Sequence, residues 1–162
     1  MLITSSSLFL KGPRMRQYEL HKRIGYKVSR LSRTMQARLE RDIAKFGISR
    51  LMWCVLTGVG DEDVSNPSEL ADYVGITRPA MSRLLRDMET KGMVERSGGN
   101  GDGRTIEIRL SDIGRDALER ARSTVDALNR HFSSKLSPER LAEFMLAVDL
   151  LGSDEHERLT KL

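Results

Sequence analysis

Apolar residues recur every three or four positions in long stretches near both ends of the chain, which is the spacing of amphipathic helices. The first stretch predicts one helix over about 16–45, ended by Gly47. It carries the apolar residues Leu20, Ile24, Val28, Leu31, Met35 and Leu39. A second helix is predicted over 50–59, with Ser49 as its cap and a loop at Gly58, Gly60 and 61–63. Its apolar residues are predicted to be buried: Leu51, Met52, Trp53, Val55 and Leu56.

The stretch 66–92 predicts two helices joined by a tight turn. Asn66 is a typical N-cap, Pro67 suits the first helical turn, and Glu69 completes a capping box. Gly75 ends this short helix, and Thr77 caps a longer one that runs to Gly92. A short helix, a tight turn and a longer helix make a helix-turn-helix pattern.

Two strand-like stretches follow, 93–96 and 105–110, the second with clear alternation of apolar and polar residues. A glycine-rich loop separates them, SGGNGDGR over 97–104. A phosphate cradle would require that loop to lead into a helix N-terminus, but here it leads into a strand. The order strand, loop, strand after a helix-turn-helix therefore favours a hairpin wing, whose glycines permit close approach to a groove.

Two more helices complete the predicted fold. Ser111 caps the first, and Ser137 with Pro138 and Glu139 begins the second. The first carries the apolar stripe Ile113, Ala117, Ala121, Val125, Leu128 and Phe132. The fold class predicted is mainly α: a winged helix-turn-helix core with a two-stranded wing, plus long N- and C-terminal helices forming a dimerisation body. The expected domains are a tail at 1–15, a dimerisation helix at 16–47, the winged helix at 48–110 and dimerisation helices at 111–162.

Charge is unevenly distributed along the 162 residues, whose net charge is +4. Residues 11–45 contain eleven basic and three acidic side chains, whereas 69–110 contain seven of each. The basic block suggests a polyanion partner, with a solvated helix face as the alternative. Because the helix-turn-helix stretch is electrically balanced, any binding there must depend on where individual charges lie.

Other classes of function find little support in the composition. Cys54 is the single cysteine, so no disulfide can form within the chain, and a reducing, cytoplasmic setting is expected. No apolar run approaches the roughly 20 residues of a membrane span, so no membrane partner is expected. His21, His131 and His156 are scattered and lack metal-ligand spacing, which predicts no metal and no cofactor. No catalytic constellation is recognisable, so an enzyme is not expected.

This order of elements resembles the MarR (multiple antibiotic resistance regulator) family of bacterial transcription factors over about 16–151. Four stretches carry the resemblance: 48–56, 69–85 with its Gly75-Ile76-Thr77-Arg78-Pro79 turn, 89–96, and Asp102-Gly103-Arg104-Thr105 followed by Leu110-Ser111-Asp112-Ile113-Gly114. The glycine-rich wing tip and the basic N-terminal extension depart from the family pattern.

The resemblance implies a ligand-responsive repressor, or an activator, that acts as a homodimer on a pseudo-palindromic operator in double-stranded DNA. It also implies a small-molecule effector, aromatic or anionic and of unknown identity, bound between the DNA-binding module and the dimer body. The alternative is a dimeric winged-helix protein-interaction module without DNA binding.

In such a fold the helix after the turn enters the major groove. Its candidate contact residues are Thr77, Arg78, Pro79, Ala80, Ser82, Arg83 and Arg86. Arg78 or Arg83 can bind guanine O6 and N7 with two hydrogen bonds. Pro79 and Ala80 suit thymine methyl groups, and Thr77 and Ser82 suit phosphates. At least one arginine of this helix is expected to pair instead with Asp87 or Glu89.

Further contacts are expected on either side of that helix. Asn66 and Ser68 are candidates for the DNA backbone, and Arg104 in the wing for the minor groove. The resemblance makes Asp102 a structural partner that holds the wing, although it also suits a simple turn residue. Leu84, Leu85 and Met88 are expected in the core. Cys54, beside Trp53, is expected to be a buried structural residue rather than a redox sensor.

Overall fold

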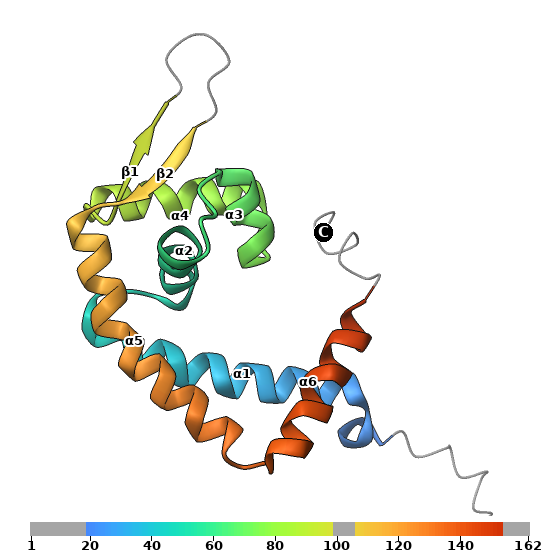
Figure 1. Ribbon diagram of the computed structural model, residues 1–162. Coiled ribbons are helices and arrows are strands. Elements are labelled where there is room, and N and C mark those ends of the chain that lie inside the picture. The colour runs from blue at the N-terminus through green and yellow to red at the C-terminus, as the bar shows by residue number, and fades with distance from the viewer. Residues whose placement is uncertain (1–18, 99–105, 154–162) are drawn as a thin grey trace, which may run out of the picture. The chain divides into compact units, whose positions relative to one another are not determined.

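The computed structural model describes residues 19–98 and 106–153, whose helices and strands are labelled in Figure 1. Two short 3-10 turns, η1 and η2, flank the first of six helices, and two strands precede the fifth. In chain order the elements are η1 (Leu20–Lys22), α1 (Ile24–Ile43), η2 (Ala44–Phe46), α2 (Arg50–Asp61), α3 (Pro67–Val74), α4 (Arg78–Thr90), β1 (Val94–Ser97), β2 (Glu107–Leu110), α5 (Asp112–Ser133) and α6 (Pro138–Gly152). The fold class predicted from the sequence is confirmed.

The chain divides into two units, Met1–Met35 and Gln36–Leu162, and each is described by itself. In the first unit the predicted helix over 16–45 is interrupted. Arg23 has extended backbone angles (φ −77°, ψ 136°), so η1 ends there and α1 begins only at Ile24. Lys22 pairs with Glu19 at 2.9 Å. The spacing of apolar residues continues through Arg23, so the sequence pattern does not indicate the break in the helix.

In the second unit, α1 ends at Ile43, and η2 continues to Phe46. Gly47 ends this segment in the left-handed region at φ 74°, as predicted. Ser49 caps α2 by accepting a hydrogen bond from the backbone N–H of Met52 at 3.3 Å.

The prediction that Gly58 and Gly60 belong to a loop is wrong, because both lie inside α2. A Cβ on Gly58 would lie 3.0 Å from the ring of Tyr73, and one on Gly60 would lie 2.7 Å from the side chain of Leu118. The two glycines therefore allow α3 and α5 to approach α2 closely.

Helix α2 is less completely buried than its composition suggests. Met52, Val55 and Leu56 belong to the core, whereas Leu51 and Trp53 are only half-buried, which corrects the prediction. An α-helix packed on one side keeps part of its circumference exposed, and Leu51 and Trp53 lie outside the most buried stripe.

The core of the second unit lies where α2, α3, α4, the two strands and the first half of α5 meet. Its largest fully buried side chains are Ile43, Leu56, Leu70, Met81, Leu85, Met88, Ile108 and Val55. Leu84 packs against this cluster but is only half-buried.

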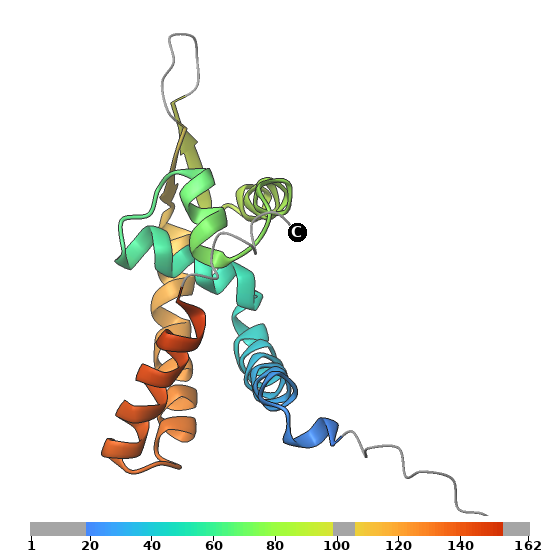
Figure 2. The same ribbon diagram turned by 90° about the vertical axis from the view of Figure 1, so that its right-hand side faces the viewer.

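The wing strands pair antiparallel, with Val94 opposite Leu110 and Ser97 opposite Glu107. In Figure 2 the two strands project upward, away from the helices α2, α3 and α4. Ile108 also donates its backbone N–H to Ser65 at 2.9 Å, which ties β2 to the segment before α3. The predicted hairpin is confirmed for the described strands, and its glycine-rich tip lies outside the described residues.

Helices α5 and α6 begin as predicted, with Ser111 accepting from the N–H of Gly114 at 3.1 Å and Ser137 from that of Arg140 at 3.4 Å. No single helix in 19–98 and 106–153 is long and apolar enough to cross a membrane. One pair of consecutive helical segments among the described residues, Ile24–Phe46 and Arg50–Asp61, is long and apolar enough for a membrane span when taken together. The two segments are bent by 75° relative to each other.

Candidate nucleic-acid interface

The two faces of α4 differ sharply in character. Met81, Leu85 and Met88 point into the core and are fully buried. The opposite face is exposed and contains Arg78, Pro79, Ser82, Arg83 and Arg86, with Thr77 just before the helix. Ala80 lies at the margin and is half-buried. The structure thus brings the predicted recognition-helix residues together on one accessible helix surface.

The arginines on this surface have no carboxylate partner among the described residues. Arg86 donates from Nε to the backbone oxygen of Ser82 at 3.3 Å. Arg78 and Arg83 form no polar contact with any residue in 19–98 or 106–153. The expectation that one of them pairs with Asp87 or Glu89 is therefore wrong.

The two acids near the end of α4 bind other cations instead. Asp87 pairs with Lys91 at 3.0 Å, and Glu89 pairs with Nε of Arg96 in β1 at 3.0 Å. Lys91 follows Asp87 by one helical turn, and the fold brings Arg96 to Glu89. The exposed face of α4 therefore keeps its positive charge although the module as a whole is balanced.

Thr77 sets the orientation of the start of α4. Its side-chain oxygen accepts a hydrogen bond from the N–H of Ala80 at 3.4 Å. Gly75, in the left-handed region at φ 73°, closes the preceding helix by donating to the carbonyl oxygens of Ala71 and Asp72. The turn that presents α4 is thus held on both sides, as predicted.

Asn66 caps α3 by accepting from the N–H groups of Ser68 and Glu69 at 2.8 and 3.4 Å. Both Asn66 and Ser68 are half-buried. These bonds use the side-chain oxygen Oδ1 of Asn66, so the N–H groups of its side-chain amide remain able to donate to a phosphate. The first helix of the pair therefore has donors at its N-terminus.

The base of the wing is anchored to the helices on both strands. Arg96 in β1 pairs with Glu89 of α4, as described above, and Arg115 of α5 donates to the carbonyl oxygen of Leu110 at 2.7 Å. The Ser111 hydroxyl bonds to the carbonyl oxygen of Gly92. The predicted wing residues Asp102 and Arg104 lie outside the described residues.

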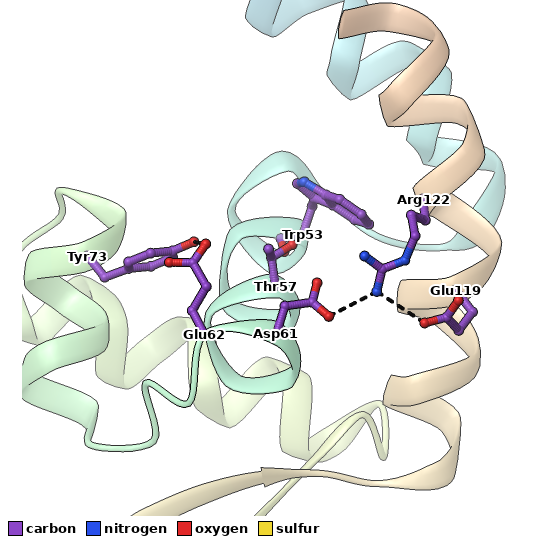
Figure 3. A network of polar contacts seen from close by, with 7 residues as sticks. All are labelled: Trp53, Thr57, Asp61, Glu62, Tyr73, Glu119 and Arg122. Atoms are coloured by element: carbon purple, nitrogen blue, oxygen red, sulfur yellow. Dashed lines mark hydrogen bonds and ion pairs between the residues drawn. The ribbon is translucent and has the colours of Figure 1, made fainter.

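The C-terminal end of α2 is joined to α5 and to α3 by polar contacts, shown in Figure 3. Asp61 accepts from Nη2 of Arg122 in α5 at 2.9 Å, and Arg122 also reaches Glu119 at 3.1 Å. These bonds, first to Asp61 and then to Glu119, raise the pKa of Arg122. The adjacent Glu62 accepts from the hydroxyl of Tyr73 in α3 at 2.9 Å. The end of α2 thus connects α5 to the first helix of the helix-turn-helix.

This network was not found from the sequence. Arg122 and Asp61 are 61 residues apart, and neither belongs to a local motif. Tyr73 and Glu62 are 11 residues apart and lie on different elements. Only the packing of α2 between α3 and α5 brings these side chains together.

Cys54 is free and half-buried, less enclosed than expected of a core residue. Burial is the main cause that raises its pKa, while Arg50 opposes the shift. A raised pKa disfavours the reactive thiolate, which agrees with a structural role. Among the described residues, no group of His, Cys, Asp and Glu could hold a metal ion, and His156 lies outside them.

Comparisons with known proteins agree with this arrangement. Residues 46–105 match the model described as MarR family. The HTH-type transcriptional repressor Rv2887 of Mycobacterium tuberculosis (strain H37Rv) is 25% identical over 131 residues, which cover 81% of this chain and 94% of that protein. Its crystal structure in complex with salicylic acid has a TM-score of 0.62 at 23% identity, covering 80% of this chain and 96% of that one.

Two further solved structures share the fold. A complex of MepR from S. aureus with DNA has a TM-score of 0.72 at 22% identity, covering 81% of this chain and 95% of that chain. CouR from Rhodococcus jostii RHA1, bound to p-coumaroyl-CoA, also has a TM-score of 0.72, at 18% identity, covering 85% of this chain and 96% of that chain.

The helix-turn-helix, its paired wing strands and the long helix after them define a winged helix-turn-helix protein of the DNA-binding class. The match over 46–105 and the relatives named as transcriptional repressors make the chain similar to regulators of the MarR family. The resemblance inferred from the sequence is confirmed.

Proposed function

We propose that this chain binds an operator in double-stranded DNA as a homodimer and regulates transcription in response to a small molecule. The observation that carries the proposal is the exposed face of α4, where Arg78, Arg83 and Arg86 have no acidic partner among the described residues. Three uncompensated guanidinium groups on one helix surface suit a polyanion whose groove admits a helix.

Each residue of this face has a proposed role. Arg78 and Arg83 are placed to bind guanine through two parallel hydrogen bonds. Pro79 and Ala80 contact thymine methyl groups, while Thr77, Ser82 and Arg86 contact phosphates. Asn66 and Ser68, at the start of α3, bind the DNA backbone. Arg104 of the wing enters the minor groove, and Asp102 holds the wing in place.

Dimerisation is supported by exposed apolar side chains on the helices outside the winged module. In α6, Leu146, Leu150 and Leu151 are 61, 66 and 60% exposed. In α1, Ile24 is 60% exposed. An exposed apolar surface of this extent is typical of an interface. The domain division follows: 16–47 and 111–162 form the dimer body, and 48–110 bind DNA, with half-sites about one helical turn, roughly 34 Å, apart.

A ligand alters DNA affinity only if it binds one spacing of the two recognition helices better than another. Relatives were solved with salicylic acid, an aromatic acid, and with p-coumaroyl-CoA, the thioester of a phenolic acid. By analogy we propose a small aromatic or anionic effector for this chain, and no cofactor.

The test is a fluorescence anisotropy titration of the full chain on labelled DNA from upstream of its own gene. The titration is repeated at salt concentrations from about 50 to about 300 mM, because affinity that depends on phosphate contacts falls as salt rises. Arg83→Ala should weaken binding to the preferred site. Arg130→Ala is the matched control, because it removes the same charge from an exposed position in α5. Absence of binding to any duplex at the lowest salt would favour a protein-interaction module instead.

A further inference from the structure

The turn from α4 into the wing is held by backbone hydrogen bonds. Gly92 lies in the left-handed region at φ 68° and donates its N–H to the carbonyl oxygen of Glu89 at 2.9 Å. Met93 donates its N–H to the carbonyl oxygen of Met88, also at 2.9 Å. Two such bonds make a Schellman motif, which ends a helix and turns the chain away from it. They fix where β1 begins, but the direction of the strand depends on contacts further along the hairpin.

One side-chain contact ties β1 back to α4 beyond this turn. Nε of Arg96 lies 3.0 Å from Oε1 of Glu89. On β2, the residue opposite Arg96 is Ile108, whose N–H bonds to the carbonyl oxygen of Ser65 at 2.9 Å. Within 19–98 and 106–153, these two are the outermost polar contacts between the hairpin and the rest of the module. Of the two, the Glu89–Arg96 pair is the one that reaches the recognition helix.

The place of Arg96 in the strand explains why it takes a charged partner. Positions 94 and 96 share one face of the hairpin, because side chains alternate along a strand. On that face Val94 is 3% exposed, and Ile108, opposite Arg96, is 1% exposed. A guanidinium beside buried apolar side chains requires a compensating acceptor, and Glu89 provides it. The side chain of Arg96 is therefore directed to α4 by the fold itself.

The pair contributes orientation more than stability. The side chains of Arg96 and Glu89 are 31 and 32% exposed, so both retain contact with water. Ion pairs of this kind stabilise a fold only slightly, because solvent screening and lost side-chain freedom offset the attraction. A contact that joins two elements nevertheless restricts the angle between them. Because the pair is neutral as a whole, it also adds no net charge that would attract a phosphate.

We infer that Glu89 and Arg96 are positioning residues for DNA binding, whose ion pair sets the direction in which the wing leaves the end of α4. With the pair intact, the hairpin reaches the minor groove while α4 lies in the major groove. Without the pair, α4 still binds, but the hairpin no longer keeps the angle that the minor groove requires. The inference rests on the proposed function, and the contacts that carry it all lie among the described residues.

The test is a dimethyl sulfate footprint of the full chain on DNA from upstream of its own gene. This reagent methylates N7 of guanine, which faces the major groove, and N3 of adenine, which faces the minor groove. The parent should protect both kinds of nitrogen. At protein concentrations that saturate the DNA, Glu89→Gln should still protect guanine N7 but should lose the protection of adenine N3. The salt slope of its affinity should fall by about one, because a cationic contact of the wing is lost.

Glu89→Gln also separates positioning from charge. The change removes an acid, so charge alone predicts tighter binding to DNA, whereas lost positioning predicts binding about tenfold weaker, the effect of one charge-assisted contact. Asp87→Asn is the matched control. It removes an acid from the same helix, but the partner of Asp87 is Lys91, one helical turn along the chain rather than in the wing. This control should keep the protection of adenine N3.

Two further variants guard against a simple loss of fold. Arg96→Gln should lose the protection of adenine N3 as Glu89→Gln does, and the exchanged pair, Glu89→Arg with Arg96→Glu, should restore it. Retained adenine protection or tighter binding in Glu89→Gln would overturn the inference and leave the proposed function intact. Loss of guanine protection as well would show that the pair maintains α4 itself, and would also overturn the inference. No protection by the parent at low salt would overturn both.

Discussion

Gly114 in α5 lies directly against the backbone of Met93: a Cβ on Gly114 would stand 2.1 Å from the Met93 carbonyl oxygen. That oxygen also accepts the N–H of Ser111, the residue that caps α5. The close approach therefore fixes the start of α5 against the segment that enters the wing. Gly114 is needed for this packing because a side chain there would collide with the backbone of Met93, which cannot move away as a flexible side chain could.

Gly114→Ala should destabilise the protein by about 3 kcal/mol, the upper part of the range for overpacked sites. Gly25→Ala is the control, because a Cβ on Gly25 has nothing within 4 Å and alanine favours a helix over glycine. Urea unfolding of both variants at one fixed protein concentration gives the comparison. Equal stability of Gly114→Ala and the parent would mean that α5 does not pack against the backbone of Met93 as described.

The second prediction concerns the hydroxyl of Tyr73. Burial, and then its hydrogen bond to Glu62 and the charge of that carboxylate, raises the pKa of Tyr73 to about 12. An unfolded tyrosine has a pKa of about 10, so the neutral phenol is favoured in the fold. The associated stability is fully present below about pH 10 and is lost as the pH rises through the folded pKa of about 12.

Titration of the three tyrosines, followed by phenolate absorbance, should therefore show one component that ionises at higher pH than the others. The variant Tyr73→Phe should lack that component. Glu62→Gln should lower the pKa of Tyr73, because the amide can still accept the bond but lacks the charge. A late component that persists in Tyr73→Phe would assign it to another tyrosine.

Local sequence signals anticipated much of the fold. Ser49, Thr77 and Ser111 were all recognised as helix caps, because a cap depends on side chain and backbone a few residues apart. Gly75 and Gly47 were recognised as helix ends for the same reason. Gly75 and Thr77 lie at the turn that orients α4, so the predicted contact residues lie together on one helix face.

Features that depend on tertiary packing could not be predicted. Gly60 resembles a loop residue until Leu118 is seen to occupy the space where its side chain would stand. The sequence suggests an arginine of the same helix as the partner of Glu89, but in the folded chain Glu89 pairs with Arg96 of β1. The wing contacts Asp102 and Arg104 lie outside the described residues and stay predictions.

Cys54 should react slowly with a thiol reagent at pH 8, because burial raises its pKa and shields its sulfur. Unfolding in urea should restore the rate of an ordinary thiol. Mild peroxide should leave DNA binding unchanged in the parent and in Cys54→Ser. A peroxide-dependent loss of binding that only the parent shows would establish Cys54 as a sensor.

Thr77 offers a separation of helix capping from DNA contact. Thr77→Asp retains an acceptor for the N–H of Ala80 and adds a favourable charge at the helix N-terminus. Stability should therefore persist, whereas DNA affinity should fall about tenfold or more because a carboxylate would face phosphates. Ser137→Asp makes the same change at the cap of α6 and should leave DNA binding intact. Equal DNA affinity of both variants would place Thr77 away from the phosphates.

The last prediction distinguishes the two proposed arginine contacts with DNA. Arg83 projects from the exposed face of α4, whose backbone is held by the core residues Leu85 and Met88. A rigid helix suits a fixed two-bond contact to guanine, so Arg83→Ala should cost about 1–3 kcal/mol at one base position per half-site. Arg104, in the glycine-rich stretch between the strands, is proposed to respond to groove width rather than to a base pattern. Arg104→Ala should therefore weaken binding to many sequences, most at A·T-rich flanks, and reduce the salt slope by about one. Binding isotherms of both variants across salt and a small operator library make the comparison. Loss of preference at a single base position in Arg104→Ala, with an unchanged salt slope, would reverse the two assignments.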